Sequence, residues 1–218
     1  MKIKLDSKTL IRLTKFFAPF ILGFCVFSAL GLTLEKEVWE HLWPLLTGYF
    51  FPPLGKESII PTGVLVFGIN PLIMALSVAF VDILVALFLV WNYDLAKKIP
   101  FVGKFMVKIE TKGKNIEQKY GWVKPLRFIG IVLFVMIPFQ GSGGLVGSIV
   151  GRLIGMKPWN TFFAISIGAV IGCLLIATFA QAFRVFAEIN TELTLLLVGV
   201  IVVIAILYFI KKRRNKQE

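Results

Sequence analysis

The sequence predicts an all-α integral membrane protein with four full transmembrane helices and two oppositely oriented re-entrant helical hairpins that form an inverted repeat. Three observations lead to this fold class. Of the 218 residues 57% are hydrophobic and the mean hydropathy is +0.85, more apolar surface than a soluble domain of this length could bury. Basic residues gather beside apolar segments, and two apolar stretches are rich in proline and glycine. We therefore treat residues 1–218 as a single membrane domain.

The first predicted element is a basic tail with a span, together residues 1–34. Five lysines and arginines precede an apolar run from Phe16 to Leu34, which is long enough to cross a hydrocarbon core of about 30 Å. No small-residue cleavage site follows this run, so we interpret it as a retained helix rather than a signal peptide. An acidic loop is expected next, over residues 35–41.

Residues 42–91 are predicted to form a hairpin followed by a span. Proline and glycine interrupt the first part so often that a straight helix is excluded, which favours two short arms around a broken tip. Asn70 and Pro71 form a typical helix start, and the apolar run from Pro71 to Trp91 can cross the membrane. The residues expected to shape the broken backbone of this hairpin are Pro52, Pro53, Gly55 and Pro61.

The second half of the chain repeats this order after a basic segment. Residues 92–127 carry nine lysines and arginines among spaced apolar side chains, which is typical of an amphipathic helix on the cytoplasmic surface. Residues 128–183 are predicted to form a second hairpin and a span that opens at Lys157 and Pro158. The breakers expected in this hairpin are Pro138, Gly141, Gly143 and Gly144.

The distribution of charge predicts the topology. A polar loop over residues 184–192, a last span over 193–210 and a basic tail over 211–218 complete the chain. The N-terminal tail, the central basic segment and the C-terminal tail hold 19 of the 24 lysines and arginines. The positive-inside rule places these three segments, and so both termini, in the cytoplasm of a plasma-membrane protein. Each breaker-rich stretch then begins and ends on one side of the membrane, so the two must be re-entrant from opposite faces.

The two predicted hairpins also have similar sequence patterns. Pro52-Pro53-Leu54-Gly55 followed by Gly68-Ile69-Asn70-Pro71 matches Pro138-Phe139-Gln140-Gly141 followed by Gly155-Met156-Lys157-Pro158, at offsets of 86 and 87 positions. Broken helices in inverted repeats are typical of secondary transporters, in which the substrate site lies at the repeat interface. The sequence therefore predicts a site where the two hairpin tips meet.

Two acidic residues are candidates for that site, because ionisable groups at membrane depth are costly and usually functional. Glu57, in the first hairpin, could bind a proton, a cation or a cationic substrate; the alternative is a structural pair with Lys56 or Arg152. Asp82, near the centre of its span, could relay protons or pair with Arg152. Its alternative role is to accept a hydrogen bond from the exposed backbone of a broken hairpin.

Arg152 is the candidate for an anion site in the second hairpin. A guanidinium matches phosphate geometry, and freed amides at Gly141–Gly144 beside a helix N-terminus also favour anions. Snorkelling of Arg152 to the cytoplasmic surface is the alternative. Gln140 and Ser142 could bond a head group or cap the broken helix. The predicted substrate- and proton-binding residues are Glu57, Asp82, Gln140, Ser142 and Arg152.

Glycines recur at every fourth position through the second hairpin and so share one helix face, which predicts close packing on a neighbouring helix. These glycines are Gly143, Gly147, Gly151 and Gly155. No catalytic triad, metal-ligand spacing or phosphate loop is present, so we expect no enzyme, no metal and no cofactor. The net charge of +12 does not indicate nucleic acid, because the basic residues flank apolar segments.

Two stretches resemble the small multidrug export protein family. Glu57-Ser58-Ile59-Ile60-Pro61 resembles its Glu-x-x-x-Pro element, and Ile137 to Gly147, continued by Leu153 to Met156, resembles its Pro-x-x-Gly-Thr-Gly…Gly…Leu-Gly-Met element. The similarity covers roughly residues 50–180. That family is similar to the DedA superfamily, also called VTT or SNARE-associated Golgi proteins.

The DedA resemblance implies two opposed re-entrant hairpins, with an acidic residue on the first, which maps to Glu57, and polar or basic residues on the second. DedA proteins usually carry arginine soon after the proline of the second element. This chain departs from that pattern, because it has Gln140 there and no arginine before Arg152.

The leading hypothesis from the sequence is a DedA-like, proton-coupled translocase of lipid that bears phosphate, of the polyprenyl-phosphate type. The first alternative is a proton-coupled exporter of small amphipathic cations, and the second is a membrane scaffold. The expected partners are membrane lipids, protons, the phosphate-bearing lipid or small cation, and a second copy of the chain in a homo-oligomer.

Overall fold

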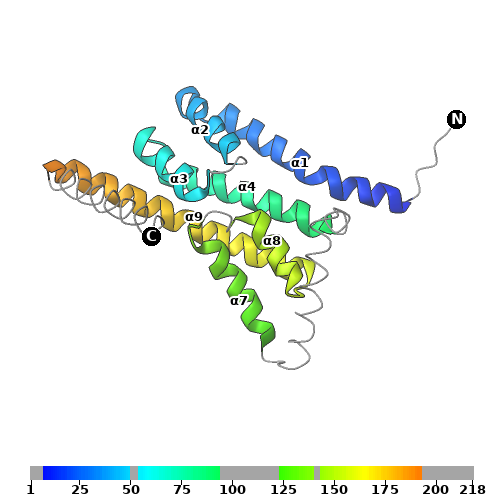
Figure 1. Cartoon of the computed structure of the whole chain (residues 1–218). Helices are drawn as coiled ribbons and strands as arrows, with labels where there is room; N and C mark the ends of the chain where they lie inside the picture. The colour runs from blue at the N-terminus through cyan, green and yellow to red at the C-terminus, as the bar shows by residue number, and fades with distance from the viewer. Residues whose placement is uncertain (1–6, 50–53, 94–122, 140–142, 193–218) are drawn as a thin grey trace, which may run out of the picture.

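The computed structural model describes residues 7–49, 54–93, 123–139 and 143–192. Within these ranges all regular secondary structure is helical (Figure 1). The elements are α1 (Ser7–Thr33), α2 (Lys36–Gly48), α3 (Lys56–Pro61), the π-helical turn η1 (Thr62–Val66), α4 (Pro71–Trp91), α7 (Val123–Met136), α8 (Gly144–Leu153) and α9 (Pro158–Ile189).

Three of the described helices are long and apolar enough to cross a membrane, namely α1, α4 and α9. They support the prediction of a multi-pass, all-helical membrane protein. The predicted fourth span at 193–210 and the tail at 211–218 lie outside the described residues, as does most of the basic segment 92–127.

Both predicted span starts are confirmed. α4 begins at Pro71, and the side chain of Asn70 caps it by accepting a hydrogen bond of 2.9 Å from the backbone amide of Leu72. α9 begins at Pro158, directly after Lys157. Proline is favoured at the first helical position because its missing N–H would have no partner there.

The predicted loop at 35–41 is wrong, because α2 begins at Lys36 and includes all but the first of the acidic residues that suggested a loop. Glu37 lies in the first turn of α2, where a negative charge interacts favourably with the helix dipole. Lys36 and Glu40 form an i,i+4 ion pair at 3.8 Å. The first span also starts earlier than predicted, at Ser7, because basic residues are good helix formers.

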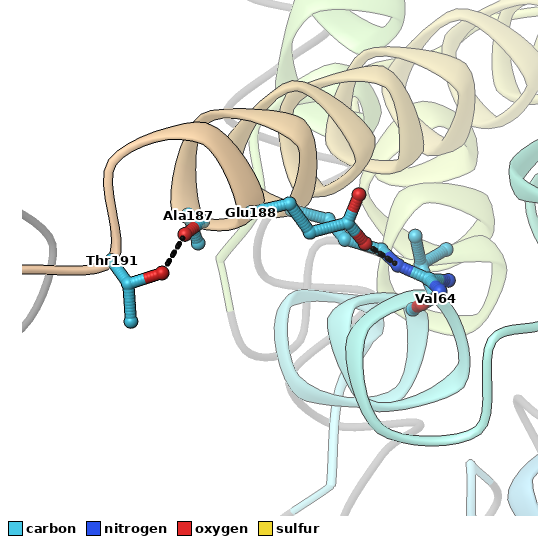
Figure 2. Close-up of polar contacts among 5 residues, drawn as sticks. Val64, Ala187, Glu188 and Thr191 are labelled. Atoms are coloured by element: carbon cyan, nitrogen blue, oxygen red, sulfur yellow. Dashed lines mark hydrogen bonds and ion pairs between the residues drawn. The ribbon is translucent and has the colours of Figure 1, made fainter.

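The predicted loop at 184–192 is wrong for most of its length, since α9 continues to Ile189. No glycine or proline occurs between Cys173 and Ile189 to end the helix. Arg184 Nε lies 3.0 Å from Glu188 Oε1 in an i,i+4 ion pair, and Arg184 Nη1 donates to the carbonyl oxygen of Val64 at 3.4 Å. Figure 2 shows Glu188 on the last turns of α9, with Val64 beside them.

The first breaker-rich stretch forms short helical pieces, as predicted. α2 ends at Gly48, and α3 begins at Lys56 and runs into the π-helical turn η1. Pro61 lies at this junction and has no N–H for the carbonyl oxygen of Glu57, so the regular α-helical ladder cannot continue through it. Gly68, at a φ of +64°, then turns the chain into α4.

The core is built on α4 and α9, which make the most extensive contact among the described helices. α1 contacts α4 on one side, and α7 contacts α9 on the other (Figure 1). The close approach of α7 to α9 depends on Gly168 and Gly172. A Cβ on either glycine would lie within 2.7 Å of a backbone carbonyl oxygen of α7.

The short helices α3 and α8 each pack on the long helix from the other half of the chain, an arrangement called crosswise packing below. α8 contacts α4 as well as α9, which follows it in the chain, and α3 contacts α9 as well as α4, which follows it. Each short helix is followed by a glycine at positive φ, Gly68 or Gly155, and then by a helix with proline at its first position. Each short helix therefore lies against the span of the other half of the chain.

Candidate functional site

A cavity of about 340 Å³ lies where the N-termini of α3 and α8 meet the middle of α4. Three charged side chains line it, those of Lys56, Glu57 and Asp82, together with Tyr49 at the end of α2. A hollow of about 460 Å³ between α4 and α9 has no charged residue among the described residues that line it. The charged cavity is the candidate site, and it lies between two helix starts that follow the breaker-rich stretches.

Asp82 is buried, with 3% of its surface exposed, and its carboxylate holds the start of α8 against α4. Its Oδ1 accepts a hydrogen bond of 2.7 Å from the amide of Gly144 and one of 2.9 Å from the hydroxyl of Tyr49. The amides at a helix start have no partner within the helix, and a carboxylate suits them in both geometry and charge. Of the roles foreseen for Asp82, the structure shows a hydrogen bond accepted from exposed backbone, here the amide at the start of α8.

Lys56 is more deeply buried than either acid, with 2% of its surface exposed. Its Nζ donates to the carbonyl oxygen of Val135, in the last turn of α7, and it interacts electrostatically with Asp82. The last carbonyls of a helix lack intrahelical partners, so a buried ammonium fits this position. Lys56 thereby connects the start of the first short helix to the end of α7.

Glu57 lies in the first turn of α3, close to Gly55, which is the N-cap residue of that helix. A Cβ on Gly55 would collide with both carboxylate oxygens of Glu57, so the absence of a side chain at position 55 leaves the room that this carboxylate occupies. Oε2 of Glu57 is buried and has no hydrogen-bond partner among the described residues. Oδ2 of Asp82 is also buried and has no hydrogen-bond partner among the described residues. The cavity therefore contains carboxylate oxygens that could accept a proton or a cation.

Two glycines make the close approach at this site possible. A Cβ on Gly144 would collide with the backbone carbonyl of Asp82, and a Cβ on Gly143 would lie 2.8 Å from both Asp82 Oδ1 and the Tyr49 hydroxyl. The start of α8 therefore touches the backbone of α4 directly, and the amide of Gly144 can reach the carboxylate of Asp82.

Arg152 lies at the other end of α8 from this cavity. Arg152 lies eight positions after Gly144, which corresponds to about 12 Å along the helix axis. Its Nη1 donates to the carbonyl oxygen of Met156 at 2.7 Å, and its guanidinium lies 4.7 Å from the ring centroid of Tyr93. Among the described residues Arg152 forms no ion pair with Glu57 or Asp82. The structure therefore does not bring Arg152 and the Gly144 amide together in one anion site.

The glycines that recur every fourth position in and around α8 have two different roles. Cβ atoms on Gly147 and Gly151 would lie 2.7 Å from Val135 and 2.6 Å from Thr161, so both glycines lie at close helix contacts. Gly155 is outside the helix at a φ of +83°, and the amide of Met156 bonds the carbonyl of Gly151. Gly155 thus ends α8 in a Schellman motif instead of extending the packing face.

The remaining predicted residues belong to the breaker-rich stretches. Pro138 lies two residues after the end of α7, where it ends the helix. The other predicted residues of the tips lie outside the described residues, namely Pro52, Pro53, Gln140, Gly141 and Ser142. The binding roles assigned to Glu57, Asp82, Gln140, Ser142 and Arg152 stay predictions.

Sequence reasoning missed two lining residues, Lys56 and Tyr49. Lys56 was considered only as a partner of Glu57, and no local pattern shows that its ammonium reaches a carbonyl 79 positions further on. Tyr49 follows α2 as one aromatic residue among several. Among the described residues no group of three or more His, Cys, Asp or Glu side chains could hold a metal ion.

A family model described as small multi-drug export protein matches residues 58–175 of the chain. The match covers α4, α7 and α8 completely and α3 and α9 in part, and it starts one residue after Glu57. No curated protein and no solved structure matches the chain. Because the matched segment spans more than half of the 218 residues, the chain belongs to the small multi-drug export protein family of membrane proteins.

Proposed function

We propose that this protein is a proton-coupled exporter of small amphipathic cations, with Glu57 as the residue that alternately holds a proton and the substrate. One observation carries the proposal: Oε2 of Glu57 is buried at the charged cavity with no hydrogen-bond partner among the described residues. Asp82 also has an unbonded oxygen, Oδ2, but its Oδ1 is bonded to the Gly144 amide, and Lys56 is bonded to a backbone carbonyl oxygen. A buried carboxylate without a partner is costly unless a proton or a cation neutralises it.

The amphipathic character of the substrate is inferred from the walls of the cavity. Leu54, Phe139 and Leu145 line it, and all three are exposed apolar side chains. In a bilayer such residues face lipid tails, so an apolar ion could enter past them from the membrane. A carboxylate surrounded by apolar walls suits a cation that carries a large hydrophobic body.

For this function we propose the membrane topology that the sequence predicts. Four spans, two oppositely oriented re-entrant hairpins and cytoplasmic termini in the plasma membrane would place the cavity at the interface of an inverted repeat. The crosswise packing of α3 on α9 and α8 on α4 supports this arrangement, as do the matching turns at Gly68 and Gly155. The arrangement includes no catalytic chemistry, and the DedA resemblance remains part of the proposal.

A second candidate is a translocase of phosphate-bearing lipid. The apolar walls of the cavity favour it, because a lipid tail could stay in the membrane while the head group crosses. The position of Arg152 favours cation export instead, since this arginine lies about 12 Å along α8 from the Gly144 amide. That amide already binds Asp82, and two carboxylates would repel a phosphate. A membrane scaffold would give no reason for a charged cavity.

The test is transport by purified protein in proteoliposomes. We expect a pH gradient to drive tetraphenylphosphonium uptake in the wild type, and Glu57→Gln to abolish this uptake while thermal stability is kept. Glu40→Gln is the matched control, because Glu40 is an exposed acid on α2. Unchanged uptake in Glu57→Gln would reject the proposal. Flipping of labelled polyprenyl phosphate without any cation transport would favour the second candidate.

The hairpin topology is tested by labelling single cysteines in a variant without Cys25 and Cys173. Glu37→Cys and Val66→Cys probe the two ends of the first hairpin, and both positions are exposed. A membrane-impermeant thiol reagent should label both from the outside. Labelling of the two positions from opposite sides would show that this segment crosses the membrane.

A further inference from the structure

Two acidic side chains at the charged cavity each keep one buried oxygen without a hydrogen-bond partner among the described residues. These atoms are Oε2 of Glu57, at the start of α3, and Oδ2 of Asp82, in the middle of α4. Only 3% of the surface of Asp82 is exposed, which shields its oxygen from water. A buried acceptor without a donor costs free energy, so a ligand that supplies donors to both oxygens gains affinity from each.

The side-chain donors at the cavity are directed elsewhere. The ammonium of Lys56 donates to a backbone carbonyl oxygen of α7, and among the described residues it forms no ion pair with Glu57 or Asp82. The hydroxyl of Tyr49 and the amide of Gly144 both donate to Oδ1 of Asp82, at 2.9 Å and 2.7 Å. One oxygen of Asp82 therefore accepts two hydrogen bonds, whereas no described side chain donates to the other or to Oε2 of Glu57.

We propose that the cation taken by this site carries its own N–H donors, as a protonated primary amine does, and donates to Oε2 of Glu57 and Oδ2 of Asp82 together. This inference rests on the proposed export function and specifies its substrate class. A cavity of about 340 Å³ is small for a ligand site, so a cationic group inside it lies close to both acids. Glu57 remains the acid that exchanges proton for substrate, and Asp82 is a second, specificity-determining contact.

Other cations satisfy these oxygens less well. A quaternary cation has no N–H to donate, so it would compensate charge but leave both oxygens without hydrogen bonds. A hard metal ion such as Ca²⁺ takes about six to eight oxygen ligands, more than the two free oxygens offer. Charge-assisted N–H···O bonds to carboxylates, in contrast, are among the strong hydrogen bonds of proteins. The site should therefore select an amine over a quaternary cation with the same body, although apolar burial alone favours the extra methyl groups of the quaternary one.

Three probes with one benzyl body separate hydrogen bonding from charge. Benzylammonium has three N–H donors, N,N-dimethylbenzylammonium has one and benzyltrimethylammonium has none, while each carries a single positive charge. Their affinity for the purified protein in detergent is measured by isothermal titration, at a pH at which both amines are protonated. A hydrogen bond to a carboxylate should be worth about tenfold in affinity. We expect benzylammonium to bind at least about tenfold tighter than benzyltrimethylammonium, with the dimethyl probe between them.

Two variants change the surroundings of one oxygen of Asp82 each. Asp82→Asn keeps an oxygen for Gly144 and Tyr49, which places the amide nitrogen where Oδ2 was and turns an acceptor into a donor. The preference for benzylammonium over benzyltrimethylammonium should fall about tenfold, since the lost charge weakens both probes and cancels in their ratio. Tyr49→Phe is the matched control, because it removes a donor from Oδ1 and leaves Oδ2 unchanged. Its preference should equal that of the wild type.

The outcomes separate this inference from the export function. Equal or tighter binding of benzyltrimethylammonium by the wild type would overturn the inference, and so would an unchanged preference in Asp82→Asn. If Asp82→Asn does not fold, the order of the three probes on the wild type still decides. Uptake of tetraphenylphosphonium without any preference for the amine would overturn the inference alone. A wild type that binds none of the benzyl probes and takes up no tetraphenylphosphonium would overturn the export function itself.

Discussion

The backbone amide of Gly144 donates a hydrogen bond of 2.7 Å to Oδ1 of Asp82, and a Cβ at position 144 would collide with the backbone of that same residue. One glycine and one aspartate thus place the start of α8 directly on the middle of α4. The contact joins two halves of the chain that are 62 positions apart. It also places the carboxylate of Asp82 at the charged cavity, next to Lys56 and Glu57.

We expect Gly144→Ala to destabilise the protein by about 3 kcal/mol or more, because the new methyl group meets backbone that cannot move aside. Thermal unfolding in detergent measures this loss. Gly130→Ala is the control, since a Cβ there meets nothing within 4 Å and alanine favours the helix. Equal stability of the two variants would contradict the close contact between α8 and α4.

Two substitutions at Asp82 should lower the free energy of unfolding of the protein by very different amounts. Asp82→Asn keeps an acceptor for the Gly144 amide and should lower the free energy of unfolding by about 1 kcal/mol or less. Asp82→Leu leaves that amide and the Tyr49 hydroxyl unbonded and should cost about 3–5 kcal/mol. Chemical unfolding in detergent compares them. Similar losses for the two variants would show that Asp82 does not hold the helix start.

Gly55→Ala should impair transport with little effect on folding. Gly55 has extended backbone angles that any residue can adopt, and the group in the way of a new methyl is the flexible carboxylate of Glu57. That carboxylate must therefore move from its place at the cavity. Tetraphenylphosphonium affinity, measured by isothermal titration, should fall at least tenfold. Gly48→Ala, whose Cβ would make only ordinary contact with Leu54, should bind like the wild type.

Arg152→Gln should lower stability and leave cation exchange intact. The guanidinium bonds the carbonyl of Met156 at the end of α8 and stacks on Tyr93, so its loss should cost about 1–3 kcal/mol. Transport by the folded fraction should stay within twofold of the wild type. Full stability combined with lost substrate binding would instead support an anion site at Arg152 and the lipid-phosphate function.

Much of the fold could be predicted because proline and glycine mark its breaks. The helix starts at Pro71 and Pro158 follow from local chemistry, and the π-helical turn follows a proline inside a short helix. The errors arose where charged residues were interpreted as loops. In α2 and α9 the charges form i,i+4 pairs along the helix, a pattern that hydropathy alone does not reveal.

The candidate site could be predicted only in part. Glu57 and Asp82 were identified because acids are rare at membrane depth, and the structure brings both to one cavity. Lys56 was considered only as a partner of Glu57, because the carbonyl oxygen on α7 that its ammonium reaches is distant in sequence. Arg152 was grouped with the glycine-rich amides because the two are close in sequence, although a helix separates them.

The crosswise packing of the short helices sets an order for biogenesis. α3, with Ile59 and Ile60 buried in the core, rests against α9, which is synthesised about a hundred residues later. At 5–20 residues per second the ribosome needs on the order of 5–20 s to supply that surface. During this interval α3 can pack on α2, η1 and α4, but the surface of α3 that α9 later covers stays open, so the insertion machinery must shelter that surface until the second half emerges.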